Sequence, residues 1–85
     1  MAKVSMYCTA VCPYCTMAER LLVSRGVADI EKIRVDLDGA QLEEMMARTS
    51  RRTVPQIFIG DYHVGGYDDL AELDQEGGLA QRLAG

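Results

Sequence analysis

Two cysteines separated by two residues, Cys12 and Cys15, are the residues of this sequence best suited to chemistry. They lie in the stretch TAVCPYCTMAER, where a short apolar run gives way to a helical pattern. Cysteine pairs at this spacing occur as structural cross-links, as zinc half-sites and as redox centres. Because these uses need different surroundings, the neighbouring residues decide between them.

Pro13 indicates that a helix begins directly after the first cysteine, because proline is tolerated at the first helical position. Cys12 would then be the N-cap, with its sulfur facing the free backbone N–H groups of Tyr14 and Cys15 and the positive end of the helix dipole. Both effects favour a thiolate, and cysteines so placed have pKa values of about 3.5 to 7.5. We therefore expect Cys12 to be the attacking thiol.

Cys15 follows within the first turn of the helix, on the same face as Cys12. Side chains at i and i+3 have Cβ atoms about 5 to 6 Å apart, and a disulfide needs Cα atoms within about 4.4 to 6.8 Å. The pair can therefore open and close with little backbone movement. Since Cys15 lies further into the helix and is less exposed, we expect it to be the resolving thiol.

Other uses of the pair remain open. A permanent cross-link over so short a loop removes little entropy from the unfolded chain. A zinc site lacks its second half, since the remaining candidate ligands are Cys8 and the single histidine, His63. An iron-sulfur cluster within one chain needs four thiolates where only three cysteines exist, which leaves a cluster shared by two chains. We therefore predict a redox centre without metal or bound cofactor.

Length and composition indicate one small domain, residues 1–85. The 13 acidic and 9 basic residues give a net charge of −4, which argues against nucleic-acid binding as the main task. No stretch approaches the roughly 18 apolar residues of a membrane span, and the N-terminus lacks a signal-peptide pattern. Three clustered cysteines fit a reducing compartment. We expect a cytoplasmic protein that binds neither nucleic acid nor membranes, and a monomer.

The first half of the chain predicts a strand, a helix and a second strand. Residues 4–8 are rich in strand formers, and apolar residues at helical spacing follow over residues 13–25. Gly26 is expected to end that helix. In EKIRVDL, residues 31–37, apolar and charged side chains alternate as in a strand covered on one face.

The second half predicts a helix, a hairpin and two short helices. Asp38 is expected to cap the helix, with Gln41 in a loose capping box. The hairpin pairs residues 56–59 with 62–64 through Gly60-Asp61. The order βαβαββα(α) predicts an α/β fold with a small four-stranded mixed sheet flanked by helices.

Three motifs in this order resemble those of dithiol glutaredoxins of the small bacterial type: CPYC after the first strand, TVPQIFIG at residues 53–60 and GGYDD at residues 65–69. The resemblance runs over residues 3–83. It implies a thioredoxin-like fold and a glutathione-dependent thiol-disulfide oxidoreductase. Its co-substrate would be glutathione, and its partners would be glutathionylated or disulfide-containing proteins.

The resemblance also implies a glutathione site. Pro55 is a candidate for a cis peptide bond, in a turn that would leave the Val54 backbone free to pair with an extended peptide. Gly65-Gly66 would allow a tight bend, the free N–H groups of the helix that starts at Tyr67-Asp68 would take the γ-glutamyl carboxylate, and Asp68 would pair with the amino group. The residues expected to contact glutathione are Tyr14, Thr53, Val54, Pro55, Gly66, Tyr67 and Asp68.

Plainer interpretations of these positions stay open. Val54-Pro55 could be an ordinary strand-entry turn, Asp68 only a helix N-cap, and Tyr14 only a surface residue. A non-catalytic binding domain with the same fold is a further alternative.

The sequence departs from the family at two positions. Thr9 replaces a lysine suited to a glutathione carboxylate, and Ala47 occupies the position of a second polar or basic contact. Arg48, Arg51 and Arg52 are close enough in sequence to compensate, or they form a solvated helix end.

Two further residues are interpreted without the motifs. Cys8 is expected to behave as a small core hydrophobe, with a regulatory thiol as the alternative. His63 is expected to be a surface strand residue without a role.

Overall fold

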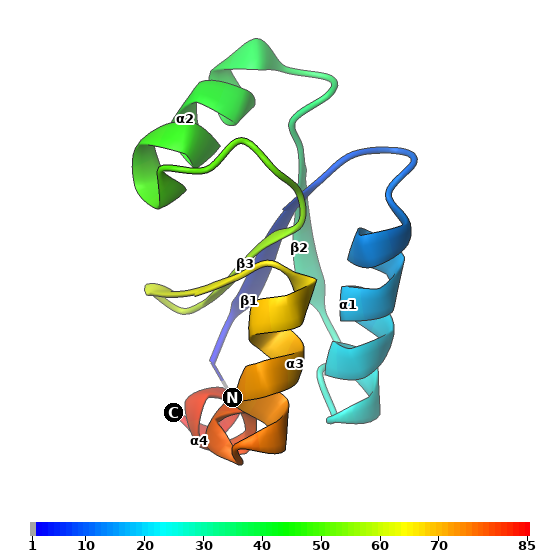
Figure 1. Ribbon diagram of the computed structural model, residues 1–85, viewed down its shortest axis with the longest axis vertical. Coiled ribbons are helices and arrows are strands. Elements are labelled where there is room, and N and C mark those ends of the chain that lie inside the picture. Colours follow the sequence, from blue (N-terminus) through cyan, green and yellow to red (C-terminus); the bar gives the residue numbers. More distant parts are fainter. Residues whose placement is uncertain (1) are drawn as a thin grey trace.

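The computed structural model describes residues 2–85, whose helices and strands follow the predicted order (Figure 1). The elements are β1 (Val4–Cys8), α1 (Pro13–Ser24), β2 (Ile30–Arg34), α2 (Gly39–Thr49), β3 (Gln56–Ile59), β4 (Tyr62–Gly65), α3 (Tyr67–Gln75) and α4 (Gly78–Ala84). No helix within these residues is long and apolar enough to cross a bilayer.

The sheet has the strand order β2-β1-β3-β4. Strand β1 pairs in parallel with β2, which requires a crossover connection, and α1 supplies it. The other pairings are antiparallel, with β3 between β1 and β4. The mixed sheet places the start of α1 and the start of β3 at the same end of the molecule (Figure 1).

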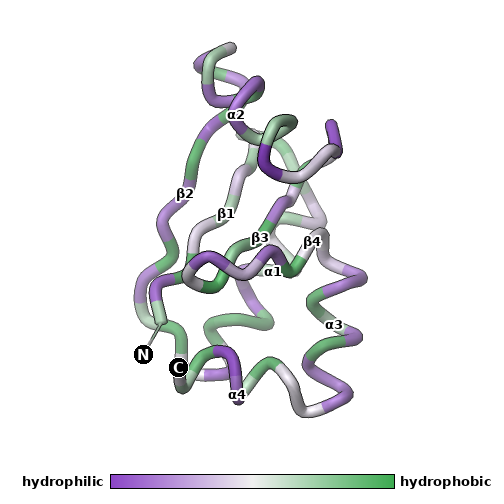
Figure 2. The backbone as a smooth tube through the Cα atoms, turned by 90° about the vertical axis from the view of Figure 1, so that its left-hand side faces the viewer, coloured by the Kyte–Doolittle hydropathy of each residue, from purple (hydrophilic) through white to green (hydrophobic). Residues whose placement is uncertain are grey.

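Side chains of β1 alternate between the two faces of the sheet and so belong to two cores. Met6 and Cys8 pack in the larger core, to which α1, α3 and α4 contribute buried residues. Tyr7 packs in the smaller core, which includes Met45 of α2. Hydrophobic and hydrophilic segments alternate along α3, as expected for a helix with one face on the sheet (Figure 2). This arrangement, helices on both faces of a four-stranded mixed sheet, is the thioredoxin-like fold.

The second strand is shorter than predicted. It covers Ile30–Arg34 rather than residues 31–37, and Leu37 is 74% exposed. The chain turns after Arg34 because the Asp36 carboxylate accepts two hydrogen bonds from the Arg34 guanidinium, at 2.7 and 2.6 Å. Val35 is buried as the alternation predicts, and its N–H still donates to Cys8 O at 3.0 Å.

Helix ends largely follow the predicted signals. Helix α1 ends at Ser24, and Gly26 follows with φ +94°. Asp38 caps α2, its Oδ1 accepting from Ala40 N at 2.9 Å. The capping-box bond expected from Gln41 is absent within residues 2–85, so the carboxylate of Asp38 acts alone.

Candidate active site

The cysteine pair is at the N-terminus of α1 and forms a disulfide bond in this structure. Cys12 is the N-cap with extended backbone, and its sulfur accepts a hydrogen bond from Cys15 N at 3.1 Å. The second bond, predicted from Tyr14 N, is not found in the described part of the chain. The two Cα atoms are 5.2 Å apart, within the range expected for a disulfide.

The two cysteines differ in exposure as predicted. Cys15 is 5% exposed and packs in the larger core, whereas Cys12 is half-buried at its edge. An incoming disulfide can therefore reach Cys12 more easily than Cys15. Around Cys12 the surface carries exposed apolar side chains, including Val11 at 88% and Tyr14 at 59%.

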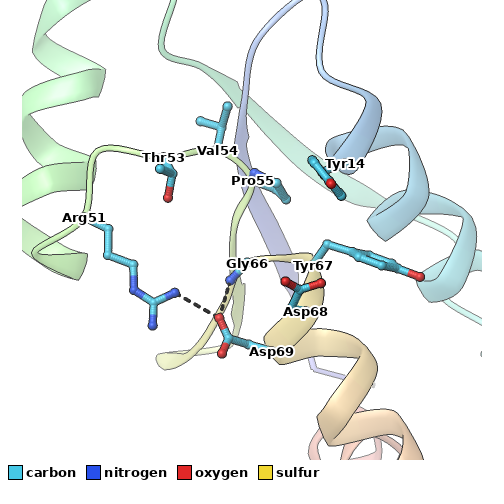
Figure 3. A pocket seen from close by; sticks show the side chains of 9 residues that line it. All are labelled: Tyr14, Arg51, Thr53, Val54, Pro55, Gly66, Tyr67, Asp68 and Asp69. Atoms are coloured by element: carbon cyan, nitrogen blue, oxygen red, sulfur yellow. Dashed lines mark hydrogen bonds and ion pairs between the residues drawn. The ribbon is translucent and has the colours of Figure 1, made fainter.

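A groove with a volume of about 230 Å³ begins at Tyr14, next to the cysteine pair in sequence (Figure 3). All seven residues predicted to contact glutathione line it, together with two that were not in that set. The lining residues are Tyr14, Arg51, Thr53, Val54, Pro55, Gly66, Tyr67, Asp68 and Asp69. The cysteines line a neighbouring hollow with Thr9 and Cys8.

The segment before β3 forms one wall of the groove. The Val54–Pro55 peptide bond is cis, as predicted. Pro55 is buried and Val54 half-buried, and no hydrogen bond to the Val54 N–H or C=O is present within residues 2–85. These two groups are therefore available to pair with an extended peptide backbone.

The opposite wall is the N-terminus of α3. Its N-cap is Gly66, so the N-cap interpretation of Asp68 is wrong; Asp68 is exposed at the second helical position. The capping carboxylate is that of Asp69, whose Oδ2 accepts from Gly66 N at 2.9 Å. Strand β4 ends at Gly65 and α3 begins at Tyr67, so the N-cap is two residues earlier than an Asp68 cap would require.

Asp69, the last residue of the GGYDD motif, was not among the predicted site residues. The same Oδ2 also accepts from Arg51 Nη1 at 2.9 Å, which joins the two walls of the groove (Figure 3). The Arg51 hydrogen bond, followed by that from Gly66 N, lowers the pKa of Asp69. Asp69 is thus neutralised by Arg51, whereas the Asp68 carboxylate at the rim has no ion-pair partner within residues 2–85. The signal in the sequence was the acidic residue three positions after Gly66.

The three candidate arginines have different surroundings. Arg51 lines the groove. Arg48 lies 3.9 Å above the Phe58 ring and donates to Tyr7 Oη at 2.8 Å, so it belongs to the sheet face under α2. Arg52 is exposed and Ala47 lies on the outer side of α2; neither contributes to the groove.

Cys8 is 4% exposed at the end of β1, and burial raises the pKa of its thiol, which favours the neutral form. This agrees with the prediction of a core hydrophobe. Within residues 2–85, no three His, Cys, Asp or Glu side chains are grouped so that they could hold a metal ion.

His63 is not the surface residue that was predicted. It is half-buried, stacks on Phe58 with ring centroids 4.9 Å apart, and its Nε2 lies 2.8 Å from Gln56 Oε1. The register that pairs His63 with Phe58 across the hairpin places it there. Burial is the main cause that lowers the pKa of His63, and the charge of Arg51 adds to it.

The loop before the cysteine pair is linked to the turn after β2 by Asp36, whose Oδ2 accepts from Ala10 N at 3.3 Å. The hydrogen bonds from Arg34 lower the pKa of Asp36 from 3.8 to about 2. A carboxyl whose pKa is lower in the folded state stabilises the fold above its unfolded pKa. That contribution is lost as the pH falls through about 2.

Asp36→Asn is therefore expected to flatten the pH dependence of stability between about pH 4 and pH 2. Urea unfolding at a series of pH values measures it, with Asp61→Asn in the exposed hairpin turn as the control. Equal slopes for Asp36→Asn and wild type in this range would show that Asp36 does not stabilise the fold in this way.

A disulfide-forming Cys-X-X-Cys pair at a helix N-terminus, beside a peptide-sized groove in a thioredoxin-like fold, defines a thiol-disulfide oxidoreductase. A family model described as Glutaredoxin matches residues 4–64. The chain belongs to the glutaredoxin family.

Relatives support the family assignment over most of the chain. A glutaredoxin of Neisseria meningitidis serogroup A is 54% identical over 79 residues, which are 93% of each chain. Glutaredoxin 3 of Escherichia coli K12 is 49% identical over 79 residues, 93% of this chain and 94% of that one. A solved glutathione complex of buckwheat glutaredoxin has a TM-score of 0.87 at 29% identity and covers 98% of this chain and 77% of that one. The protein is a glutathione-dependent thiol-disulfide oxidoreductase whose active-site pair is Cys12 and Cys15, with glutathione as co-substrate.

Proposed function

We propose that the Cys12 thiolate is the nucleophile and that Cys15 resolves the mixed disulfides it forms. The support is the asymmetry of the pair: Cys12 is the more exposed, and its sulfur already accepts a backbone N–H at the positive end of α1. The same N–H stabilises a thiolate once the disulfide is reduced. Cys15 lies one turn away and is shielded by the core.

With a glutathionylated protein, the Cys12 thiolate attacks the glutathione sulfur. The new bond joins Cys12 to glutathione, and the protein thiolate leaves and takes a proton from water. A second glutathione, as thiolate, attacks the glutathionyl sulfur; glutathione disulfide is released and the Cys12 thiolate returns. With a protein disulfide, the Cys12 thiolate attacks one sulfur and the other leaves as a thiolate. The Cys15 thiolate then attacks the Cys12 sulfur and releases the second substrate thiolate, which leaves the Cys12–Cys15 bond for two glutathione thiolates to reduce in turn.

The groove is proposed to hold the glutathionyl group. The observation that carries this is the Val54 backbone, which has no hydrogen-bond partner in the described part of the chain and lies in a groove lined by Tyr14 and the start of α3. The Val54 N–H and C=O would pair with the extended tripeptide. The free N–H groups at the start of α3 would take the γ-glutamyl carboxylate, and Asp68 its ammonium group. The other proposed contacts are Tyr14, Thr53, Pro55, Gly66 and Tyr67.

Arg51 is proposed to replace the cation missing at Thr9. Its guanidinium lines the groove and is held by one oxygen of Asp69. The remaining N–H donors of a guanidinium allow a carboxylate of glutathione to bind beside Asp69.

The substrates are proposed to be glutathionylated and disulfide-containing proteins, reduced by a monomer in the cytoplasm. The single domain, residues 1–85, carries both the cysteine pair and the groove.

Asp68→Asn tests the orientation of glutathione in the groove. Losing the ion pair at this exposed position is expected to raise KM for a glutathionylated peptide roughly three- to fivefold, with kcat unchanged. Steady-state kinetics at saturating glutathione measure both constants. Asp61→Asn removes the same charge from an exposed turn outside the groove. Equal KM values for the two variants would contradict the assignment of Asp68.

A further inference from the structure

A series of hydrogen bonds centred on the buried Gln56 lies next to the groove wall and is not used by the mechanism above. Gln56, the first residue of β3, has no exposed surface. Its Nε2 donates to Thr53 O at 3.0 Å and to Thr53 Oγ1 at 3.3 Å. Its Oε1 is 2.8 Å from His63 Nε2. All polar atoms of this amide are therefore paired.

The direction of these hydrogen bonds follows from the donors and acceptors. The contacts to Thr53 O and Oγ1 place Gln56 Nε2 on the Thr53 side, so Oε1 faces His63, and an amide oxygen can only accept. His63 Nε2 must then carry a proton and donate. Burial and the nearby Arg51 charge keep the ring neutral near pH 7, which places its single proton on Nε2. Stacking on Phe58 holds the ring plane.

The hydrogen bond from Gln56 to Thr53 O holds the peptide unit whose N–H is proposed to bind glutathione. The carbonyl of Thr53 and the N–H of Val54 belong to one peptide unit, which is planar. In this trans unit the Val54 N–H is directed opposite to the carbonyl that Gln56 holds, and Val54 lines the groove.

We propose that His63 is a positioning residue for glutathione recognition, acting through Gln56 on the Thr53–Val54 peptide unit. This rests on the proposed function, because it takes the Val54 backbone as a glutathione contact. None of the three linked side chains touches the cysteine pair. Loss of the His63 donor leaves Gln56 Oε1 buried without a partner, so the amide turns and the peptide unit is no longer held. Recognition of the glutathionyl group weakens, while exchange at Cys12 continues.

Single-turnover rates of the reduced full-length protein test this without a second glutathione. One peptide is presented as its glutathione mixed disulfide and as its cysteamine mixed disulfide, which lacks the tripeptide backbone. Wild type is expected to prefer the glutathione form. His63→Phe keeps a ring over Phe58 but has no donor, and should lower that preference about tenfold with the cysteamine rate unchanged. His63→Gln offers an N–H near the same place and should restore most of it.

The proposal is overturned if His63→Phe keeps the wild-type preference, if both rates fall equally, or if His63→Gln is as impaired as His63→Phe. A wild type without preference overturns the glutathione assignment of the groove, and this inference with it. A nitrogen NMR spectrum of the wild-type protein tests the hydrogen bond from His63 to Gln56 even if the variants do not fold. His63 is the only histidine, and its ring must be protonated on Nε2. A ring protonated on Nδ1 alone contradicts the proposed hydrogen bond from His63 Nε2 to Gln56 Oε1.

Discussion

Cys12→Ser is expected to reduce both deglutathionylation and protein-disulfide reduction to the rate of uncatalysed exchange. A serine hydroxyl in the same N-cap position accepts the Cys15 N–H as the sulfur does, so the fold is kept. It forms no thiolate and no mixed disulfide, so neither reaction can begin. Glutathione-dependent reduction of a glutathionylated peptide and of a disulfide-containing protein measures the two activities.

The matched control is Cys8→Ala, which removes the one cysteine outside the active-site pair. Cys8 is a buried thiol in the larger core, so its loss costs packing but no redox step. Thermal unfolding of both variants separates misfolding from lost chemistry. A Cys12→Ser protein that retains either activity would reverse the proposed roles of the two active-site cysteines.

Cys15→Ser is expected to separate the two reactions. Deglutathionylation needs only Cys12 and glutathione, so its rate should remain near that of wild type. Protein-disulfide reduction needs the second thiol to displace the bound substrate, so it should stop at the mixed disulfide. The backbone N–H of residue 15 still stabilises the Cys12 thiolate in this variant.

Mass spectrometry of the trapped species measures this outcome directly. Incubation with a disulfide-containing protein should accumulate a covalent complex through Cys12, which excess glutathione resolves slowly. If Cys15→Ser instead loses deglutathionylation and forms no complex, the resolving role does not belong to Cys15.

The sequence predicted those parts of the site that depend on neighbours in the chain. Pro13 after Cys12 located the helix start, and the predicted cis bond at Val54–Pro55 is present. The N-cap of α3 was harder to predict. Asp68 and Asp69 are adjacent acidic residues, and which of them caps the helix depends on where the chain leaves β4.

Contacts across the sheet could not be predicted in the same way. The partners of His63 follow from the register of β3 and β4, and the shortening of β2 follows from a turn held by Asp36. One signal was available: Gln56 is a polar residue in an otherwise apolar strand, and a buried amide needs partners. Thr53 and His63 are those partners.

Val54 packs against both cores and also lines the groove. In the proposed glutathione site, recognition through its main-chain atoms does not depend on the identity of this side chain, but it does depend on where both cores hold it. Under this proposal, a substitution in either core, even far from the cysteines, changes ligand selectivity as well as stability.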